Sequence, residues 1–166
     1  MIFALTGSVS PGNDTWLIDS GASKHMIGYK ESLSFLEQKE SPHKVILGDD
    51  SQYPIEGLGE AYYKLDYGKP MKMKDVLYVP GLKKNILSIS SLEKKGFRVS
   101  YIDGIVLMWT KGKTIDHAVE IGFEEGGLYK LKGRTDSALT TSTINPSELW
   151  QKRIAHVHYK SLPIVS

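Results

Sequence analysis

Short runs of apolar residues, some alternating with polar residues, recur along most of the chain up to residue 131. Sixteen glycines and seven prolines punctuate the chain, and those between Gly21 and Gly133 separate the runs at short intervals. Short strands with turn signals between them are typical of an all-β sandwich or barrel. The pattern predicts strands over residues 16–19, 45–47, 60–65, 71–79, 97–101, 105–110, 115–122 and 128–131.

The clearest turn signal is Asp103-Gly104, which lies between two apolar pairs. A two-residue type I′ turn needs positive φ at both central positions, and Asp and Gly are among the few residues that adopt it readily. The stretches 48–51 (Gly-Asp-Asp-Ser) and 66–69 (Asp-Tyr-Gly-Lys) are weaker candidates of the same kind.

Two short helices are predicted. Ser90 and Glu93 have the spacing of a capping box, and Lys94-Lys95-Gly96 supplies the cations and the glycine that commonly end a helix. A second helix should begin at Asn145-Pro146, with Glu148 three residues after the cap, and run to about Val157.

The polar stretch 133–147 has no periodicity and is interpreted as a linker. The expected organisation is therefore a leader (1–14), a β domain (15–132), this linker, and the beginning of a helical unit (148–166).

Composition excludes several classes of protein. The chain has 21 basic and 19 acidic residues, a net charge of +2, so charge alone gives no argument for nucleic-acid binding. The absence of cysteine excludes disulfides, thiolate metal sites and cysteine nucleophiles. No apolar run approaches the roughly 20 residues of a membrane span. We expect a soluble, cytoplasmic protein that does not bind membranes.

The most informative stretch is residues 16–23, Trp-Leu-Ile-Asp-Ser-Gly-Ala-Ser, in which an apolar strand delivers Asp19 into a turn of small residues. One interpretation is a strand that ends in an Asx turn. The other is the active-site loop of an aspartic protease, which needs two carboxylates close enough to share one proton. Gly21 would allow two such loops to approach, and Ser20 would hydrogen-bond across to the other loop.

Further blocks extend this pattern over nearly the whole chain: residues 16–26, 47–51, 75–88, 126–129 and 149–156. In order and spacing, the chain resembles the protease and adjoining region of copia-type LTR retrotransposon Pol polyproteins, which belong with the retroviral (retropepsin-like) aspartic proteases. The resemblance implies an all-β fold, a retropepsin-like closed β-barrel with one or two short helices, followed by a truncated pre-integrase segment.

The resemblance also implies roles for individual residues. Asp19 would be the catalytic aspartate, with Ser20 and Gly21 as its supporting turn. Residues 45–55 would form a flap whose tip binds substrate; the tip residues are Gly48, Asp49, Asp50 and Ser51. Residues 85–88 would pack under the active-site loop, with Ser88 where the wider family has glycine, and a short helix would follow.

Because the chain has only one Asp-Ser-Gly, an active enzyme must be a homodimer with one Asp19 from each copy. Its substrate would be the element's own polyprotein. No cofactor is implied. The interpretation requires Asp19 to be neither covered over nor salt-linked within its own chain, and to face a surface on which a second copy can pair. The alternative is a catalytically inactive β-barrel module or the relic of a decayed element.

Other residues have simpler explanations. His25 lacks a nucleophile motif and is expected to be structural or exposed, and Asp49-Asp50 is expected to be a solvated hairpin tip rather than a metal site. The lysine pairs 83–84 and 94–95 and the segment 130–134 are read as solvated faces, and nucleic-acid contact is not expected. The family's zinc-binding histidine is replaced by Gln151, so no metal is expected at His156.

Overall fold

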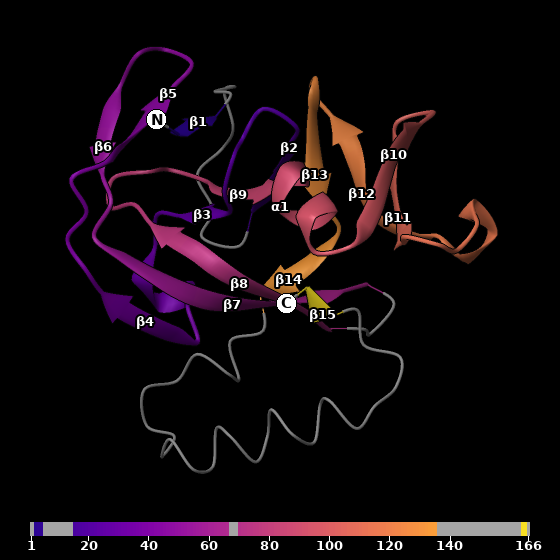
Figure 1. Ribbon diagram of the computed structural model, residues 1–166. Helices are drawn as coiled ribbons and strands as arrows, with labels where there is room; N and C mark the ends of the chain where they lie inside the picture. Colours follow the sequence, from indigo (N-terminus) through magenta and orange to yellow (C-terminus); the bar gives the residue numbers. More distant parts are fainter. Residues whose placement is uncertain (1, 5–14, 67–69, 136–163, 166) are drawn as a thin grey trace, which may run out of the picture.

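The computed structural model describes residues 2–4, 15–66, 70–135 and 164–165. Short strands joined by tight turns make up most of this part of the chain (Figure 1). The strands are β1 (Ile2–Ala4), β2 (Trp16–Asp19), β3 (Met26–Ile27), β4 (Phe35–Gln38), β5 (Lys44–Leu47), β6 (Gln52–Pro54), β7 (Gly57–Leu65), β8 (Pro70–Tyr78), β9 (Asn85–Ser88), β10 (Phe97–Ile102), β11 (Ile105–Thr110), β12 (Val119–Glu125), β13 (Leu128–Leu131), β14 (Gly133–Thr135) and β15 (Ile164–Val165). The helices are η1 (Lys30–Ser32), α1 (Ile89–Lys94) and η2 (Ile115–His117).

The predicted strand pattern is largely confirmed. The runs at 16–19, 105–110 and 128–131 coincide with β2, β11 and β13. The prediction for 115–122 is wrong in its first half, where η2 forms and β12 begins only at Val119. Ile115 is 45% exposed, so this part of the run lacks the buried face that a strand pattern implies.

The strands form two sheets. The larger sheet has 12 strands, with the order β10-β11-β12-β13-β2-β9-β3-β8-β7-β14, while β4 adds to β7 and β15 adds to β8. The smaller sheet consists of β1, β5 and β6. These ladders are open among the residues that the structure describes, so the all-β class is confirmed, whereas closure into a barrel stays a prediction.

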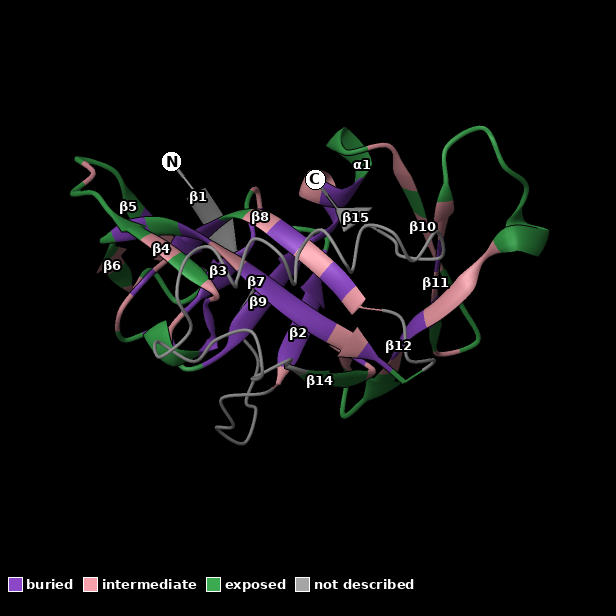
Figure 2. Cartoon of the chain, turned by 90° about the horizontal axis from the view of Figure 1, so that it is seen from below, coloured by how far each residue is buried: buried purple, intermediate pink, exposed green. Residues whose placement is uncertain are grey.

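Burial follows this layout. Figure 2 shows the central strands, including β2, β7 and β9, as buried, whereas the hairpins at both ends of the molecule are exposed. The larger core cluster includes Trp16, Tyr63 and Leu87, and a second cluster under the β5–β6 hairpin includes Val45 and Ile86. The strand that delivers Asp19 is therefore anchored between buried neighbours.

The predicted hairpin at Asp103-Gly104 is confirmed. Both residues have positive φ, 50° and 78°, and Ile102 pairs with Ile105 across the turn. Asp50 in the turn between β5 and β6 also has positive φ, 64°. The third predicted turn lies mostly outside the described residues, although β7 and β8 on either side of it pair as antiparallel strands.

The short helix after β9 is confirmed as α1, but its predicted cap is wrong. The N-cap is Ser88, whose side chain accepts a hydrogen bond from the Ser91 N–H, and Ser90 lies inside the helix. The end is as predicted, since Gly96 has φ +91° and its N–H donates to the Glu93 carbonyl.

The C-terminal predictions are only partly within the described residues. Residues 133–135, the first three of the predicted linker, instead form β14 and pair with β7. The predicted helix at 145–157 lies outside the described residues, and the proposed domain boundaries stay predictions. Within the described ranges, no helix is long and apolar enough to cross a membrane.

Candidate active site

Asp19 lies at the carboxyl end of β2, where two central strands run in parallel. β2 pairs with β9 from Trp16 opposite Asn85 to Asp19 opposite Ser88. Every residue of both strands is buried, because they lie between neighbouring strands of the large sheet. The loop that follows Asp19 therefore starts from a fixed position.

The loop after Asp19 is held by a hydrogen bond within it and by hydrogen bonds from the end of β9 and from α1. The Gly21 N–H donates to Asp19 Oδ1 over 2.7 Å, an interaction that orients the carboxylate. Ser88 Oγ donates to the carbonyl oxygen of Ala22 over 2.7 Å, and Ser91 Oγ donates to that of Ser23 over 3.4 Å. The resemblance placed residues 85–88 under the loop, and the structure has Ser88 in contact with it.

His25 is the other support of the loop. It is 2% exposed, and its Nδ1 accepts a hydrogen bond of 3.0 Å from the Ser88 N–H, which requires Nδ1 to be unprotonated. Burial, helped by the charges of Lys24 and Lys95 and opposed by that of Asp75, lowers the pKa of His25 from 6.5 to about 4. Its role is structural, one of the two outcomes expected from the sequence.

Exposure differs between neighbouring residues of the loop. Ser20 and Gly21 are exposed, whereas Asp19 is 7% exposed. The exposed surface of this loop is therefore formed mainly by the two residues that follow Asp19, while Asp19 as a whole residue is largely covered in the single chain, which is not the open position that the protease interpretation requires. Pairing with a second carboxylate requires Asp19 to become accessible.

The predicted substrate-binding residues Gly48, Asp49, Asp50 and Ser51 form the turn between β5 and β6. The Ser51 N–H donates to Asp49 Oδ1 over 3.0 Å, and hydrogen bonds from Ser51 lower the pKa of Asp49. Gly48, Asp49 and Asp50 are exposed, as expected of a solvated tip. Among the described residues, no group of three or more His, Asp or Glu side chains is arranged to hold a metal ion.

Lys84 connects this hairpin with the loop electrostatically. Burial lowers the pKa of its ammonium group, while attraction to the carboxylates of Asp19 and Asp49 opposes the shift. The prediction of a solvated face is wrong for Lys84, which is 9% exposed, although Lys83 is exposed.

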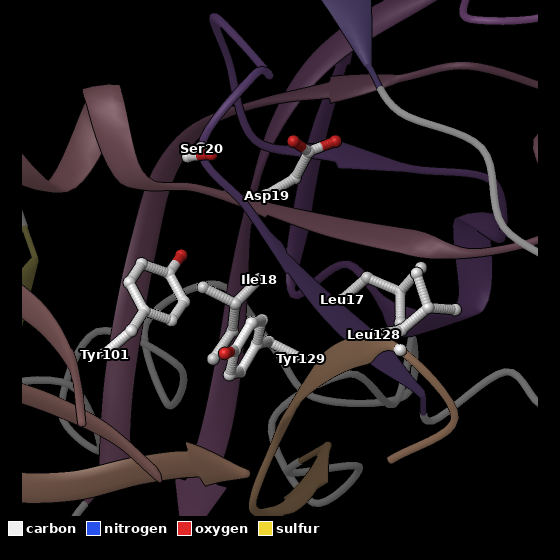
Figure 3. A pocket seen from close by; sticks show the side chains of 8 residues that line it. Leu17, Ile18, Asp19, Ser20, Tyr101, Leu128 and Tyr129 are labelled. Atoms are coloured by element: carbon white, nitrogen blue, oxygen red, sulfur yellow. The ribbon is translucent and has the colours of Figure 1, made fainter. Parts of the chain in front are cut away.

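A pocket of about 370 Å³ opens beside the loop (Figure 3). Residues 17–20 line one side, and Tyr101 and residues 127–129 line the other. The rings of Tyr101 and Tyr129 meet edge to face, with centroids 4.5 Å apart. Burial, the Asp19 charge and Tyr129 raise the pKa of Tyr101 to about 12, so its hydroxyl stays protonated at neutral pH.

The site residues predicted from the sequence do not include Lys84, Tyr101 or Tyr129. Lys84 belongs to a lysine pair that is typical of a surface. The two tyrosines are on different hairpins and meet only through the β10–β13 ladders. Both tyrosines lie in strand-like runs, which does not distinguish a pocket wall from a core. Tyr129 also belongs to the block 126–129 of the resemblance, which assigned it no role.

Comparison with known proteins agrees with the resemblance seen in the sequence. Residues 16–97 match the family described as "Pol polyprotein, beta-barrel domain". The chain is 27% identical over 157 residues to the retrovirus-related Pol polyprotein from transposon TNT 1-94 of Nicotiana tabacum, covering 91% of this chain and 11% of the relative.

Two proteins of Arabidopsis thaliana are also similar. The retrovirus-related Pol polyprotein from transposon RE1 is 26% identical over 155 residues, covering 87% of this chain and 10% of the relative. That from transposon RE2 is 34% identical over 84 residues, covering 50% of this chain and 6% of the relative. The chain thus spans about a tenth or less of these relatives. No solved structure matches it significantly.

Proposed function

From the match of residues 16–97 to the Pol polyprotein beta-barrel domain and the similarity of the chain to retrotransposon Pol polyproteins, we infer that the chain is an aspartic endopeptidase domain of the copia type. It would act as a homodimer on peptide bonds of the element's own polyprotein. The observation that carries this proposal is the Asp19 loop, with Oδ1 held by the Gly21 N–H and the loop backbone held by Ser88.

The chemistry follows from two such loops meeting on a two-fold axis. One Asp19 carboxylate takes a proton from a water molecule, and the oxygen of that water bonds to the peptide carbonyl carbon. The protonated carboxyl of the second copy donates a hydrogen bond to the carbonyl oxygen. When the C–N bond breaks, the proton passes to the leaving nitrogen, so the elements of one water molecule have been added.

The hairpin of β5 and β6 supports the proposal as a cover for the substrate. Its tip is exposed, and the charge of Asp49 acts on Lys84 together with that of Asp19. An extended peptide held between this hairpin and the loop would be bound through backbone hydrogen bonds, as in other complexes in which a peptide adds as a strand.

A peptide-cleavage assay tests the proposal. The purified 166-residue chain is incubated with a peptide library at pH 5–6 with and without a pepstatin-type inhibitor. We expect inhibitor-sensitive cleavage that Asp19→Asn abolishes. Asp116→Asn is the matched control, because Asp116 is exposed in η2 and is not among the residues that line the pocket beside the loop. If no inhibitor-sensitive cleavage occurs at concentrations at which the chain forms dimers, the proposed protease activity is refuted.

Subunit mixing tests the shared site separately. If each dimer needs two Asp19 residues, adding an equal amount of Asp19→Asn chain should lower the activity of the wild-type protein by about half, because mixed dimers form at random. Activity that is unaffected by mixing would mean that each chain works alone.

The second candidate is a catalytically inactive β module, the relic of an element. The observation that favours it is the burial of Asp19, which is 7% exposed in the single chain. This candidate predicts a monomer in sedimentation experiments at all concentrations used for the cleavage assay, whereas the protease must associate.

A further inference from the structure

The hairpin that is proposed to cover the substrate already carries an extended segment on one edge. In the small sheet, β5 pairs with β6 on one side and with β1 on the other. The pairing with β1 is parallel, with residues 2–4 in register with residues 45–47. In Figure 1, β1 lies on the side of β5 that faces the large sheet. Residues 2–4 thus occupy an edge to which an extended peptide could add as a strand.

The inner face of β5 is fixed against the Asp19 loop. Val45 and Leu47 belong to the same buried cluster as Ala22, which lies three residues after Asp19. This contact resists separation, because moving the hairpin away from the loop would expose apolar surface to water. A peptide strand on the edge of β5 would therefore be held beside the loop, at a position set by the fold.

The pairing of β1 with β5 is short enough to be exchanged. β1 has three residues, all of which pair with β5, whereas β7 and β8 have nine residues each. Parallel pairs are slightly less stable per residue than antiparallel pairs, and β5 and β6 are antiparallel. Isolated pairs of short strands are only marginally stable in water. A peptide strand of similar length could thus replace β1 while the hairpin itself stays in place.

We propose that β1 is an autoinhibitory strand: residues 2–4 occupy the edge of β5 that the peptide substrate needs, and the substrate binds only after displacing them. The inference rests on the proposed protease function and adds a regulation of its substrate site. The substrate has access only to those molecules from which β1 has detached, so its apparent affinity is lowered in proportion to their fraction. Release of β1 should therefore lower KM and leave kcat unchanged.

A binding experiment tests this exchange without relying on catalysis. The probe is a fluorescein-labelled peptide with the sequence of residues 1–6, Met-Ile-Phe-Ala-Leu-Thr. Binding is measured by fluorescence anisotropy to the Asp19→Asn chain, which should not cleave the probe, and to the same chain with Phe3→Pro and Ala4→Pro. Successive N–H groups of a strand point to opposite sides, so one of these two faces β5, and the prolines remove it.

We expect the proline variant to bind the probe at least about tenfold more tightly, because its own strand no longer competes for the edge. The matched control is the same peptide with proline at its third and fourth positions, which should bind to neither chain.

A disulfide that locks β1 in place gives the opposite perturbation. The chain has no cysteine, so Phe3→Cys with Ile46→Cys introduces a single pair. Neighbouring strands lie about 5 Å apart, within the range of roughly 4.4–6.8 Å that a disulfide spans between Cα atoms. The oxidised chain should not bind the probe, and its kcat/KM for peptide cleavage should fall at least about tenfold. Dithiothreitol should restore both.

The matched control cross-link lies in the β10–β13 meander (97–131). Ser100→Cys with Leu107→Cys joins β10 to β11, where these residues are opposite each other. Oxidation of this pair leaves β1 free and should change neither probe binding nor cleavage.

The results distinguish the autoinhibitory strand from the protease. Equal probe binding by the parent and the proline variant, equal binding by the oxidised and reduced Phe3–Ile46 cysteine pair, or no binding to any chain would overturn the strand exchange. Cleavage that the Phe3–Ile46 cross-link does not affect would overturn it as well, but would leave the protease standing. Probe exchange as expected in a chain that cleaves no peptide would overturn the protease and keep β5 as a peptide-binding edge.

Discussion

Acid should destabilise this fold through one buried histidine. His25 is 2% exposed and accepts a hydrogen bond from the Ser88 N–H, so it is neutral in the folded chain. In the unfolded chain its pKa is 6.5, and burial lowers it to about 4 in the folded chain. Between these values the unfolded state binds a proton that the folded state does not, and the free energy of unfolding falls as the pH falls.

The size of the effect follows from the two pKa values. A difference from 6.5 to about 4 corresponds to about 3 kcal/mol between pH 7 and pH 4, since each unit contributes 1.36 kcal/mol. About 2 kcal/mol of this is already lost at pH 5, because most of the titration of the unfolded chain is complete there. This is a large part of the stability of a typical domain, about 5–15 kcal/mol.

Replacement of His25 by asparagine isolates the contribution of its titration to the pH dependence of stability. In His25→Asn the side-chain oxygen can accept the Ser88 N–H, but the side chain does not titrate. The wild type should therefore lose about 3 kcal/mol more than His25→Asn on acidification from pH 7 to pH 4. Urea unfolding followed by tryptophan fluorescence measures the difference, since Trp16 is fully buried. His43→Asn, at an exposed position, is the matched control.

Two results would refute this reasoning. Parallel pH dependences for the wild type and His25→Asn would mean that His25 is not held neutral by the fold. An equally large difference for His43→Asn would mean that the effect is a general consequence of removing a histidine.

Three further substitutions test the packing around the loop by the same unfolding measurement. Ser88→Ala removes the cap of α1 and a hydrogen bond to the loop and should cost about 1–2 kcal/mol, whereas Ser90→Ala should be close to neutral. Gly122→Ala places a Cβ atom 2.4 Å from a backbone oxygen and should cost about 1–3 kcal/mol; a neutral result would mean that the meander can shift away from β2. Gly104→Ala, at φ +78°, should cost about 1–2 kcal/mol, and Gly104→Asn should recover part of that loss, unless the hairpin changes its turn type.

The sequence predicted those features that depend on neighbouring residues. Strand β2 was recognisable from its apolar run, and Asp103-Gly104 from its turn chemistry, because local backbone preference and burial agree there. The cap of α1 was misassigned because Ser88 and Ser90 are both suitable residues close to the helix start. Tertiary structure decides between them: Ser88 ends β9 opposite Asp19 and remains extended there.

Features that depend on distant residues were not predictable in this way. Tyr101 and Tyr129 are brought together by the register of three successive antiparallel ladders, which no local pattern encodes. Lys84 is buried because the residue after it enters β9, the parallel partner of β2. The candidate catalytic loop could be predicted from the sequence, whereas the pocket residues beside it could be identified only from the three-dimensional structure.

If the chain pairs through Asp19 as proposed, the burial of Asp19 determines what dimer formation must achieve. In the single chain Asp19 is 7% exposed, and a second carboxylate brought against it would be tolerated only if the pair shares one proton. Dimer formation should then bind one proton, so the dimer should become more stable as the pH falls. Over the same range the free energy of unfolding falls, because His25 is neutral in the folded chain and binds a proton in the unfolded chain. These opposite dependences predict an activity maximum on the acid side of neutrality, because the destabilisation that involves His25 opposes dimer formation as the pH falls. Sedimentation equilibrium of the wild type and His25→Asn from pH 4 to pH 7 separates the pH dependence of dimer formation from that of folding. The variant should still associate more strongly as the pH falls, but acid should no longer destabilise its fold through residue 25. A dimer that weakens on acidification while the chain is still folded would contradict the shared proton.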